Sequence, residues 1–292
     1  MGCPKKDCCT HNPENDVIAF PGTDGHDTPW KFYNHLIGHI PEDLIVRDFC
    51  LGTHWSYVEA DCGMGISYTC KGGARRRYTL DLRGLPLRTV AELAKSWCFE
   101  EATLGVAALN AYYAQPALLD PLGATYDEPV ELPDGTLRKM DAFELMRPRV
   151  EAAGRERGEG GTHVTVVGHF PHVDRIQEYA QLTVLERNCT QPLDTPDPAC
   201  EYVLPSTDFA FITGVTIINK TAPRLLDLTK QATTVFVGPS VVMSPFLFDW
   251  GVEMLAGSIV ADPEKARFAV KNGAGQFFGE ALQMTCINRP SH

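Results

Sequence analysis

The sequence has no long apolar stretch. No run approaches the roughly 20 residues that a helix needs to cross a bilayer, and the N-terminus has no apolar core of a signal peptide. Met1-Gly2-Cys3 is similar to an acylated N-terminus, but Lys6 stands where that motif requires Ser or Thr. We therefore expect a cytoplasmic protein with no membrane partner.

Basic charge is also scarce. The chain has 26 Lys and Arg against 37 Asp and Glu, which gives a net charge of −11. Arg75-Arg76-Arg77 is an isolated run, typical of a solvated turn, so no nucleic-acid partner is expected. With 44% hydrophobic and 22% charged residues, the composition is that of a globular protein, and 292 residues favour two domains.

Several common catalytic motifs are missing. The chain has no HExxH motif, no nucleophile elbow with a Ser-His-Asp order and no phosphate-binding P-loop. Cys62-Gly63-Met64-Gly65 has too few glycines for such a loop and lacks the Lys-Ser/Thr ending. It predicts a tight entry into a strand instead.

Cysteine, by contrast, is plentiful, with ten in the chain. In a reducing compartment we expect most of them as thiols, and those within apolar runs as small buried residues. Cys3, Cys8, Cys9 and His11 lie together in residues 1–15, which we predict to be a disordered Cys-rich leader. They offer soft ligands for zinc or copper(I), but their spacing fits no standard zinc pattern and favours a mobile tail.

The first half, residues 16–153, predicts an α+β domain. A helix is expected over residues 28–39, short antiparallel strands over 44–80, and helices from Thr89 to Ala114 and from Asp141 to Val150. Asn110 lies on a surface of small apolar residues, where it either caps the packing of the sheet or lines a ligand cleft. The charged, glycine-rich residues 154–161 predict the domain boundary.

The second half, residues 154–292, alternates strands and helices, which predicts a doubly wound parallel sheet. Its clearest unit is 208–240, with a wholly apolar strand at Phe209–Ile212 and a second strand at Thr234–Val237. A helix begins after Thr221, a candidate N-cap, with Pro223 in its first turn.

Polar loops follow both strands of this unit. Because ligands of open α/β sheets bind outside the carboxyl ends of the strands, we expect these loops to line a ligand site. Good turn-forming residues would give the same composition without any ligand. The candidate ligand-binding residues here are Thr213, Gly214, Thr216, Asn219, Thr221, Gly238, Pro239 and Ser240.

The first strand of the second half is followed by half of a nucleotide-binding fingerprint. Gly168 is the only glycine of the turn, and Glu186 follows at about the distance of a ribose-binding acid. Phe170 and Pro171 replace the glycines that let a pyrophosphate approach, which argues against a standard dinucleotide site. An adenosyl ligand remains compatible with this pattern.

His169 stands at the carboxyl end of the same strand and is the candidate catalytic acid or base. His169 and Glu186 are also the candidate metal ligands. His163 and His172 suit loop positions without a role. Further along, Phe248 and Trp250 either cover a planar ligand or pack into the core.

Taken in order, six blocks of the second half resemble the heavy-metal chelation domain family, whose biochemical function is unknown. They are VVGHFP (166–171), LERN (185–188), TGVTIINKT (213–221), VGPS (237–240), LFDWG (247–251) and LAGSIVADPE (255–264). The resemblance implies a Rossmann-like C-terminal domain, an N-terminal domain like that of enolase, and a ligand cleft between them. It also implies a link to metals or metal chelators.

Three functions follow. The first is an enzyme or binding protein for a small polar or anionic metabolite, such as a metal chelator or its precursor. The second is a metal-binding protein without catalysis, and the third is a transferase that uses a nucleotide or S-adenosylmethionine. The expected partner is a metabolite or a metal chelate, the candidate cofactors are a transition metal ion or an adenosyl ligand, and a homo-oligomer is left open.

Overall fold

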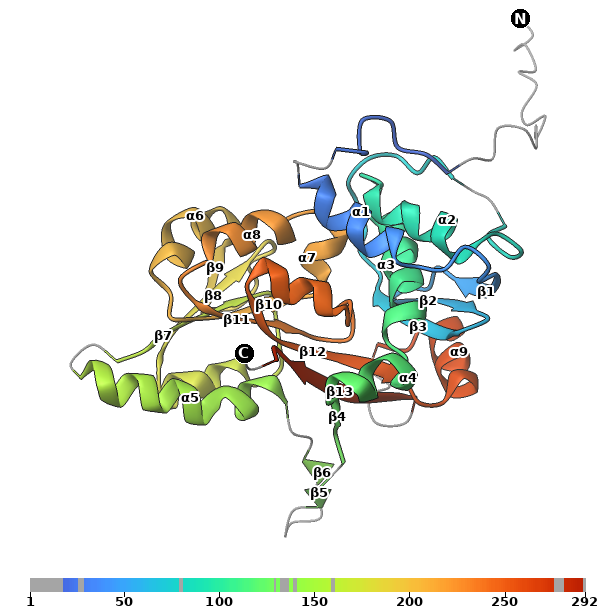
Figure 1. The fold of residues 1–292 in the computed structure, drawn as a ribbon. Helices are drawn as coiled ribbons and strands as arrows, with labels where there is room; N and C mark the ends of the chain where they lie inside the picture. Colours follow the sequence, from blue (N-terminus) through green and yellow to red (C-terminus); the bar gives the residue numbers. More distant parts are fainter. Residues whose placement is uncertain are drawn as a thin grey trace, which may run out of the picture.

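The computed structural model describes residues 18–25, 29–78, 81–128, 130–131, 137–138, 141–158, 161–275 and 281–290. The predicted leader, with its three cysteines and His11, lies outside these residues. The described chain is a mixed α/β structure that contains a large, mostly parallel sheet and a separate small antiparallel sheet (Figure 1).

The small sheet contains three antiparallel strands in the order β1-β2-β3. Its strands are β1 (Val46–Cys50), β2 (Trp55–Ala60) and β3 (Gly63–Tyr68), and its helices are α1 (Trp30–Gly38), α2 (Leu87–Ala91) and α3 (Phe99–Tyr113), with a 3-10 turn η2 (Glu92–Lys95). Gly65 allows β3 to touch α3, since a Cβ there would lie 2.0 Å from the Ala111 nitrogen. The predicted meander and the long helix are therefore both present.

The large sheet has eight strands in the order β4-β13-β12-β11-β10-β7-β8-β9. The six strands from β12 to β9 are parallel, and β13 and β4 are antiparallel to their neighbours. The strands are β4 (Thr125–Tyr126), β7 (His163–Val167), β8 (Gln181–Glu186), β9 (Asp194–Pro196), β10 (Phe209–Thr213), β11 (Thr233–Val237), β12 (Val252–Val260) and β13 (Leu282–Asn288). The Rossmann-like parallel sheet expected from the sequence is confirmed.

Helices cover both faces of this sheet. The helices after α3 are α4 (Pro116–Leu119), α5 (Ala142–Arg157), α6 (Cys200–Val203), α7 (Val215–Ile218), α8 (Ala222–Leu228) and α9 (Pro263–Lys271). The 3-10 turns are η3 (Asp120–Leu122), η4 (Val173–Glu178), η5 (Asp197–Ala199), η6 (Leu204–Ser206) and η7 (Pro245–Trp250), and β5 (Val130–Glu131) pairs with β6 (Leu137–Arg138). Figure 1 shows α5 on one side of the sheet and α7 and α8 on the other.

One apolar core joins the small sheet to the large one. It contains Val58 and Leu104 from the first half together with Ile212 and Phe236 from the large sheet. On the opposite face of the large sheet, Phe143 and its neighbours on α5 form a second core. A third core packs β2 and β3 against α9. The two halves of the chain are thus packed along a shared apolar interface, which fixes the loops at their junction.

Some elements differ from the sequence predictions. Helix α5 continues to Arg157, seven residues past its predicted end, because its first half is anchored in the core of the large sheet. The helix expected near Val173 is the 3-10 turn η4, and Tyr78, placed in a predicted strand, is not in one. Thr221 precedes α8 but makes no side-chain cap.

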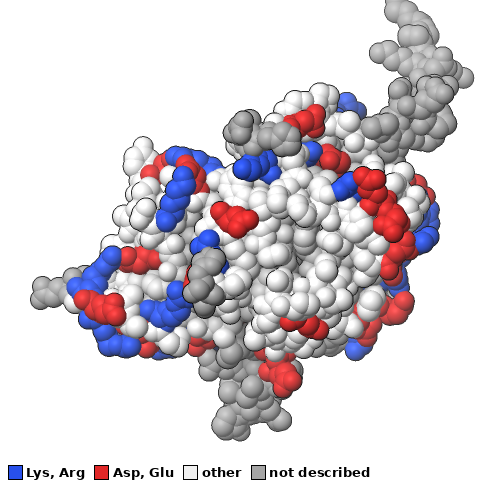
Figure 2. All heavy atoms as spheres, viewed as in Figure 1, with Lys and Arg blue, Asp and Glu red and all other residues white. Residues whose placement is uncertain are grey.

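Charges are mixed on the visible face of the molecule. In Figure 2, Lys and Arg side chains alternate with Asp and Glu around the edge, and the middle of this face is largely uncharged. In the part of the chain that is described, none of the helices combines the length and apolar character that a bilayer crossing requires.

Candidate ligand-binding pocket

A pocket of about 770 Å³ opens beside the carboxyl ends of β7, β8 and β10. From β9 to β12 the parallel strands run β9-β8-β7-β10-β11-β12, which is the 3-2-1-4-5-6 order of a Rossmann sheet. Chain direction across the sheet reverses between β7 and β10, and such a switch point leaves a crevice for ligands. Six predicted residues line this pocket: Gly168, Glu186, Thr213, Thr216, Asn219 and Thr221.

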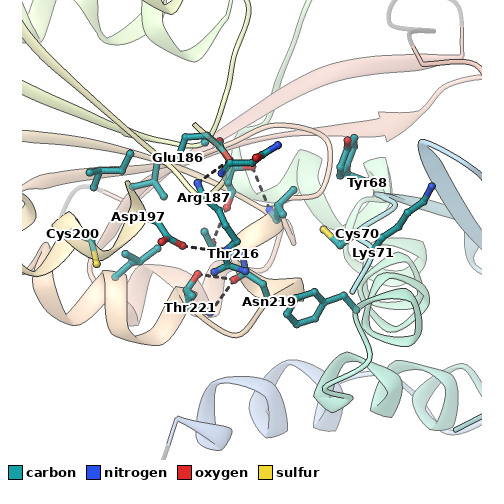
Figure 3. Close-up of a pocket in the computed structure, with 18 of the residues that line it drawn as sticks. Tyr68, Cys70, Lys71, Glu186, Arg187, Asp197, Cys200, Thr216, Asn219 and Thr221 are labelled. Atoms are coloured by element: carbon teal, nitrogen blue, oxygen red, sulfur yellow. Dashed lines mark hydrogen bonds and ion pairs between the residues drawn. The ribbon is translucent and has the colours of Figure 1, made fainter. Parts of the chain in front are cut away.

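The second wall of the pocket comes from the first half of the chain. Tyr68 ends β3, Cys70 and Lys71 follow it, and Phe99 begins α3. Figure 3 shows Tyr68, Cys70 and Lys71 across the pocket from Glu186 and Arg187. Sequence reasoning missed this wall, because nothing in the spacing of residues 68–71 indicates that they face loops more than 100 positions later.

Glu186 is held in place at the end of β8. One carboxylate oxygen, Oε1, accepts hydrogen bonds from the backbone N–H groups of Arg187 (2.9 Å) and Asn188 (3.2 Å). These bonds to the backbone restrict the side chain and leave the acceptor capacity of Oε2 for another partner.

The loop after β10 is also held by its own side chains. The Thr216 hydroxyl donates to the Thr213 carbonyl (2.7 Å), and Asn219 Oδ1 accepts from both the N–H (3.1 Å) and the hydroxyl (2.6 Å) of Thr221. Thr221 has a helical backbone conformation, with φ −83° and ψ −19°, whereas an N-cap residue is typically extended, so its hydroxyl does not cap α8. These bonds preorganise the loop that forms the floor of the pocket.

The remaining predicted ligand residues do not line this pocket. Asn110 and Ser240 make structural contacts: Asn110 Nδ2, on α3, donates to the Ile66 carbonyl of β3 within the first half (2.9 Å), and Ser240 Oγ in the second half accepts from the Tyr68 N–H (2.8 Å). Asn110 Nδ2 also lies 3.5 Å from the Pro239 carbonyl oxygen. Both side chains are buried, and among the described residues Asn110 Oδ1 has no hydrogen-bond partner.

Gly214, Gly238 and Phe248 serve close packing as well. A Cβ on Gly214 would lie 2.4 Å from the Val241 nitrogen, and Gly238 has a φ of +102° with the Phe170 ring 3.5 Å from its Cβ position. Only glycine fits such backbone approaches without strain. Phe248 is 5% exposed and belongs to the shared core, so it does not cover a ligand in this pocket.

His169 lies next to Gly168 but outside the pocket lining, and it faces Asp194. Its Nε2 atom is 3.6 Å from Asp194 Oδ1, and the Asp194 side chain is only 1% exposed. Asp194 Oδ2 accepts from the N–H groups of Thr190 and Gln191, both at 2.7 Å. Although burial raises the pKa of Asp194, these backbone bonds and His169 bring it below the usual value. Sequence reasoning missed Asp194.

A second missed residue is Lys220, which lies between Asn219 and Thr221. Its ammonium donates to the carbonyls of Ser96 and Ile218, the latter at 2.8 Å, and its backbone has a φ of +68°. Burial lowers the pKa of Lys220 to about 7. The sequence did offer a clue, since this lysine stands within the polar loop that the ligand prediction singled out.

A protein-bound metal does not fit the described donor set. In the described residues, no group of three or more His, Cys, Asp or Glu side chains is arranged to hold a metal ion. Burial raises the pKa of the two pocket thiols, Cys70 (to about 12) and Cys200, so a metal ion would have to displace their protons. His169 and Glu186, the predicted metal ligands, do not share the pocket lining.

Comparisons with known proteins agree with this architecture. A crystal structure of a protein of unknown function from the DUF364 family of Desulfitobacterium hafniense is 33% identical, with a TM-score of 0.74 over 89% of this chain and 98% of that chain. Another family member, from Pyrococcus horikoshii, is 24% identical and shares the fold, with a TM-score of 0.70 over 88% of this chain and 98% of its own.

The sequence matches point the same way. An uncharacterized protein of Methanocaldococcus jannaschii is 28% identical over 250 residues, which cover 81% of this chain and 87% of that protein. Residues 155–284 match the DUF364 family and residues 33–113 match DUF4213, and both families carry the description "Putative heavy-metal chelation". The resemblance read from the sequence blocks is confirmed: the chain belongs to the DUF364 family.

Proposed function

We propose that the protein binds a small polar metabolite in the pocket between the two sheets. The observation that carries this proposal is the place of the pocket, at the switch point of the parallel sheet and closed by residues of the first half. A volume of about 770 Å³ suits a ligand the size of a common cofactor or metabolite. Apolar and polar residues both line it, as in pockets that orient their ligand.

The family description links these proteins to metal chelation, and the pocket suggests how the link arises. Because the described residues provide no three-ligand group, a metal would enter as the complex of a chelator, or the ligand would be the chelator or its precursor. The protein would then recognise the organic part of the ligand. No step of our proposal uses a metal held by the chain itself.

His169 is the candidate proton carrier for any reaction at this site. Asp194, buried behind it, would orient the imidazole, as carboxylates do for catalytic histidines. Since His169 neighbours Gly168 at the rim of the pocket, a bound ligand would have to reach past Gly168 to contact the ring. We therefore propose ligand binding as the primary function, and catalysis by His169 as an additional function that depends on it.

The test is an unbiased search for the natural ligand. We expect mass spectrometry of the small molecules released from protein purified without an affinity tag to show one compound enriched over a control protein. That compound should bind again to the emptied protein with a stoichiometry near one. If purified ligand candidates bind equally well when the pocket is filled by a bulky side chain, the proposal is wrong.

A further inference from the structure

The charged side chains of the pocket are nearly all paired within the protein. Arg187 Nε lies 2.9 Å from Asp197 Oδ2, Arg224 pairs with Glu201, and His54 Nδ1 contacts the Gly273 carbonyl at 3.1 Å. Two lining residues are different: within the described chain, Lys71 and Glu186 have no ion-pair partner. The pocket therefore offers one uncommitted cation and one uncommitted anion.

These two residues stand on opposite walls. Glu186 ends β8 of the large sheet, whereas Lys71 follows β3 of the small one, and Figure 3 shows them apart, on the two sides of the pocket. A ligand that spans the pocket would meet a hydrogen-bond acceptor at one end and a flexible ammonium at the other. Ligands with hydroxyl donors at one end and an anionic group at the other match this arrangement.

The position of Glu186 favours a vicinal diol as the donor. It terminates the second strand of a 3-2-1-4-5-6 sheet, 18 positions after Gly168, where a Rossmann sheet carries the acid that accepts from ribose hydroxyls. Two backbone N–H groups hold Oε1, so the carboxylate is already oriented before a ligand arrives. A carboxylate held in this way accepts hydroxyl donors at little entropic cost.

The opposite wall offers surfaces for a planar base. Tyr68 is 42% exposed at the pocket, and Phe99 lines it beside Cys70. Aromatic faces of this kind stack on nucleobases. Lys71, next to them, is placed for a single anionic group.

An aromatic ring stands at the first turn, where a pyrophosphate would bind. The Phe170 ring lies 3.7 Å from the Cβ position of Gly168 and 3.5 Å from that of Gly238, so it covers the turn after β7, where a dinucleotide places its two phosphates. This position of Phe170 argues against the standard dinucleotide pose and favours a single nucleoside unit.

Resting on the proposed function, we infer that the pocket takes a ribonucleoside-type ligand with a free 2′,3′-diol and one anionic group, without a pyrophosphate. Glu186 accepts from the diol, Tyr68 and Phe99 contact the base, and Lys71 meets the anion. The anion is a phosphate in a nucleoside monophosphate and a carboxylate in an adenosyl amino acid, and both present the same chemistry to Lys71.

Calorimetric titration of the full chain tests this inference with four probes: AMP, 2′-deoxy-AMP, S-adenosylhomocysteine and NAD. We expect AMP or S-adenosylhomocysteine to bind, which also identifies the anion, and NAD to bind at least about tenfold more weakly than the better of the two. The comparison of AMP with 2′-deoxy-AMP reports on the diol. If AMP is the ligand, wild type should bind it about tenfold more tightly than 2′-deoxy-AMP. If S-adenosylhomocysteine is the ligand, it is compared with its own 2′-deoxy form in the same way.

Two variants test which residue contacts each end of the ligand. Glu186→Gln should abolish the discrimination between ribo and deoxy forms, and Lys71→Met should weaken anionic ligands about tenfold while leaving adenosine unchanged. Glu178→Gln and Lys230→Met, both exposed and outside the pocket, are the matched controls. A ribo-to-deoxy ratio that survives Glu186→Gln would overturn the inference.

The failure of this inference can be told from a failure of the proposed function. If none of the four probes binds while the compound released from the purified protein does, the pocket is a ligand site but not for nucleosides, and the inference is wrong. If that compound also binds to a variant whose pocket is filled by a bulky side chain, both the inference and the proposed function are wrong.

Discussion

The ammonium group of Lys220 donates a hydrogen bond to the backbone carbonyl of Ser96, a residue 124 positions earlier in the chain. This contact joins the loop after β10 to the turn before α3, and it lies directly behind the pocket residues Asn219 and Thr221. The left-handed backbone of Lys220, with a φ of +68°, is an uncommon conformation for a residue with a side chain. The position is therefore held by its surroundings and links the two walls of the pocket.

The first prediction concerns pH and Lys220. Burial lowers its pKa to about 7 in the folded protein, whereas an unfolded lysine titrates near 10.4. Between these values the unfolded state binds more protons, so this residue makes stability rise with pH from about 7 to about 10. We expect the difference in unfolding free energy between wild type and Lys220→Met to change across this window, by at most about 1.4 kcal/mol per pH unit.

The measurement is urea denaturation of both proteins at several pH values from 6 to 10. Lys230→Met, which removes an exposed lysine from the end of the next helix, gives the baseline for the loss of one positive charge. If the difference in unfolding free energy between wild type and Lys220→Met stays constant over this range, Lys220 has an ordinary pKa and the prediction is wrong.

The second prediction concerns Asp194. Its folded pKa is lowered, so it contributes stability that is present above the unfolded pKa of about 3.9 and is lost as the pH falls through the folded value. Asp194→Asn keeps an acceptor for the Thr190 and Gln191 N–H groups but removes the charge. We expect wild type to lose stability in acid more steeply than Asp194→Asn.

Chemical denaturation between pH 2.5 and 7 measures this difference. His169→Gln, which removes the imidazole and leaves the carboxylate bonded to the two backbone amides, should retain most of the acid sensitivity. Parallel stability curves for wild type and Asp194→Asn would contradict the assignment.

The third prediction concerns the contact between β3 and α3. A Cβ at Gly65 would lie 2.0 Å from the Ala111 nitrogen and 2.3 Å from the Ala107 carbonyl oxygen, both on the backbone of a helix that cannot yield locally. Gly65→Ala should destabilise the protein by about 1–3 kcal/mol or more, as overpacking does. Gly38→Ala, where nothing lies within 4 Å, is the matched control and should be close to neutral. Equal melting temperatures for the two variants would refute the close packing.

The sequence predicted local elements well where the pattern was strong. The strands β10 and β11 were placed to within one residue, because each is a mostly apolar run between polar loops and both faces are covered. The edge strand β9 was missed, since its three residues, which end in Pro196, carry no periodic pattern. The extent of α5 was underestimated because its last turns are exposed and charged, and only the core around Phe143 reveals why the helix continues.

The pocket could be predicted only in part, for a related reason. The ends of parallel strands meet at one edge, so Gly168, Glu186, Thr213 and Asn219 were expected together, and all of them line the pocket. Their opposite wall, including Tyr68 and Lys71, depends on how the small sheet packs on the large one. The same packing buries Asn110 and Ser240, whose polar side chains suggested ligand contacts. Asn110 bonds instead to the Ile66 carbonyl of β3, and Ser240 to the Tyr68 N–H across the junction of the two halves.

The central claim is that the pocket between the sheets holds a small molecule. Native mass spectrometry of the untagged full chain tests it directly, with Val215→Phe as the pocket-filling variant and Val203→Phe, on α6 outside the lining, as the control. We predict that wild type and Val203→Phe carry an added mass of ligand size that Val215→Phe lacks. An added mass that persists in folded Val215→Phe would contradict the account.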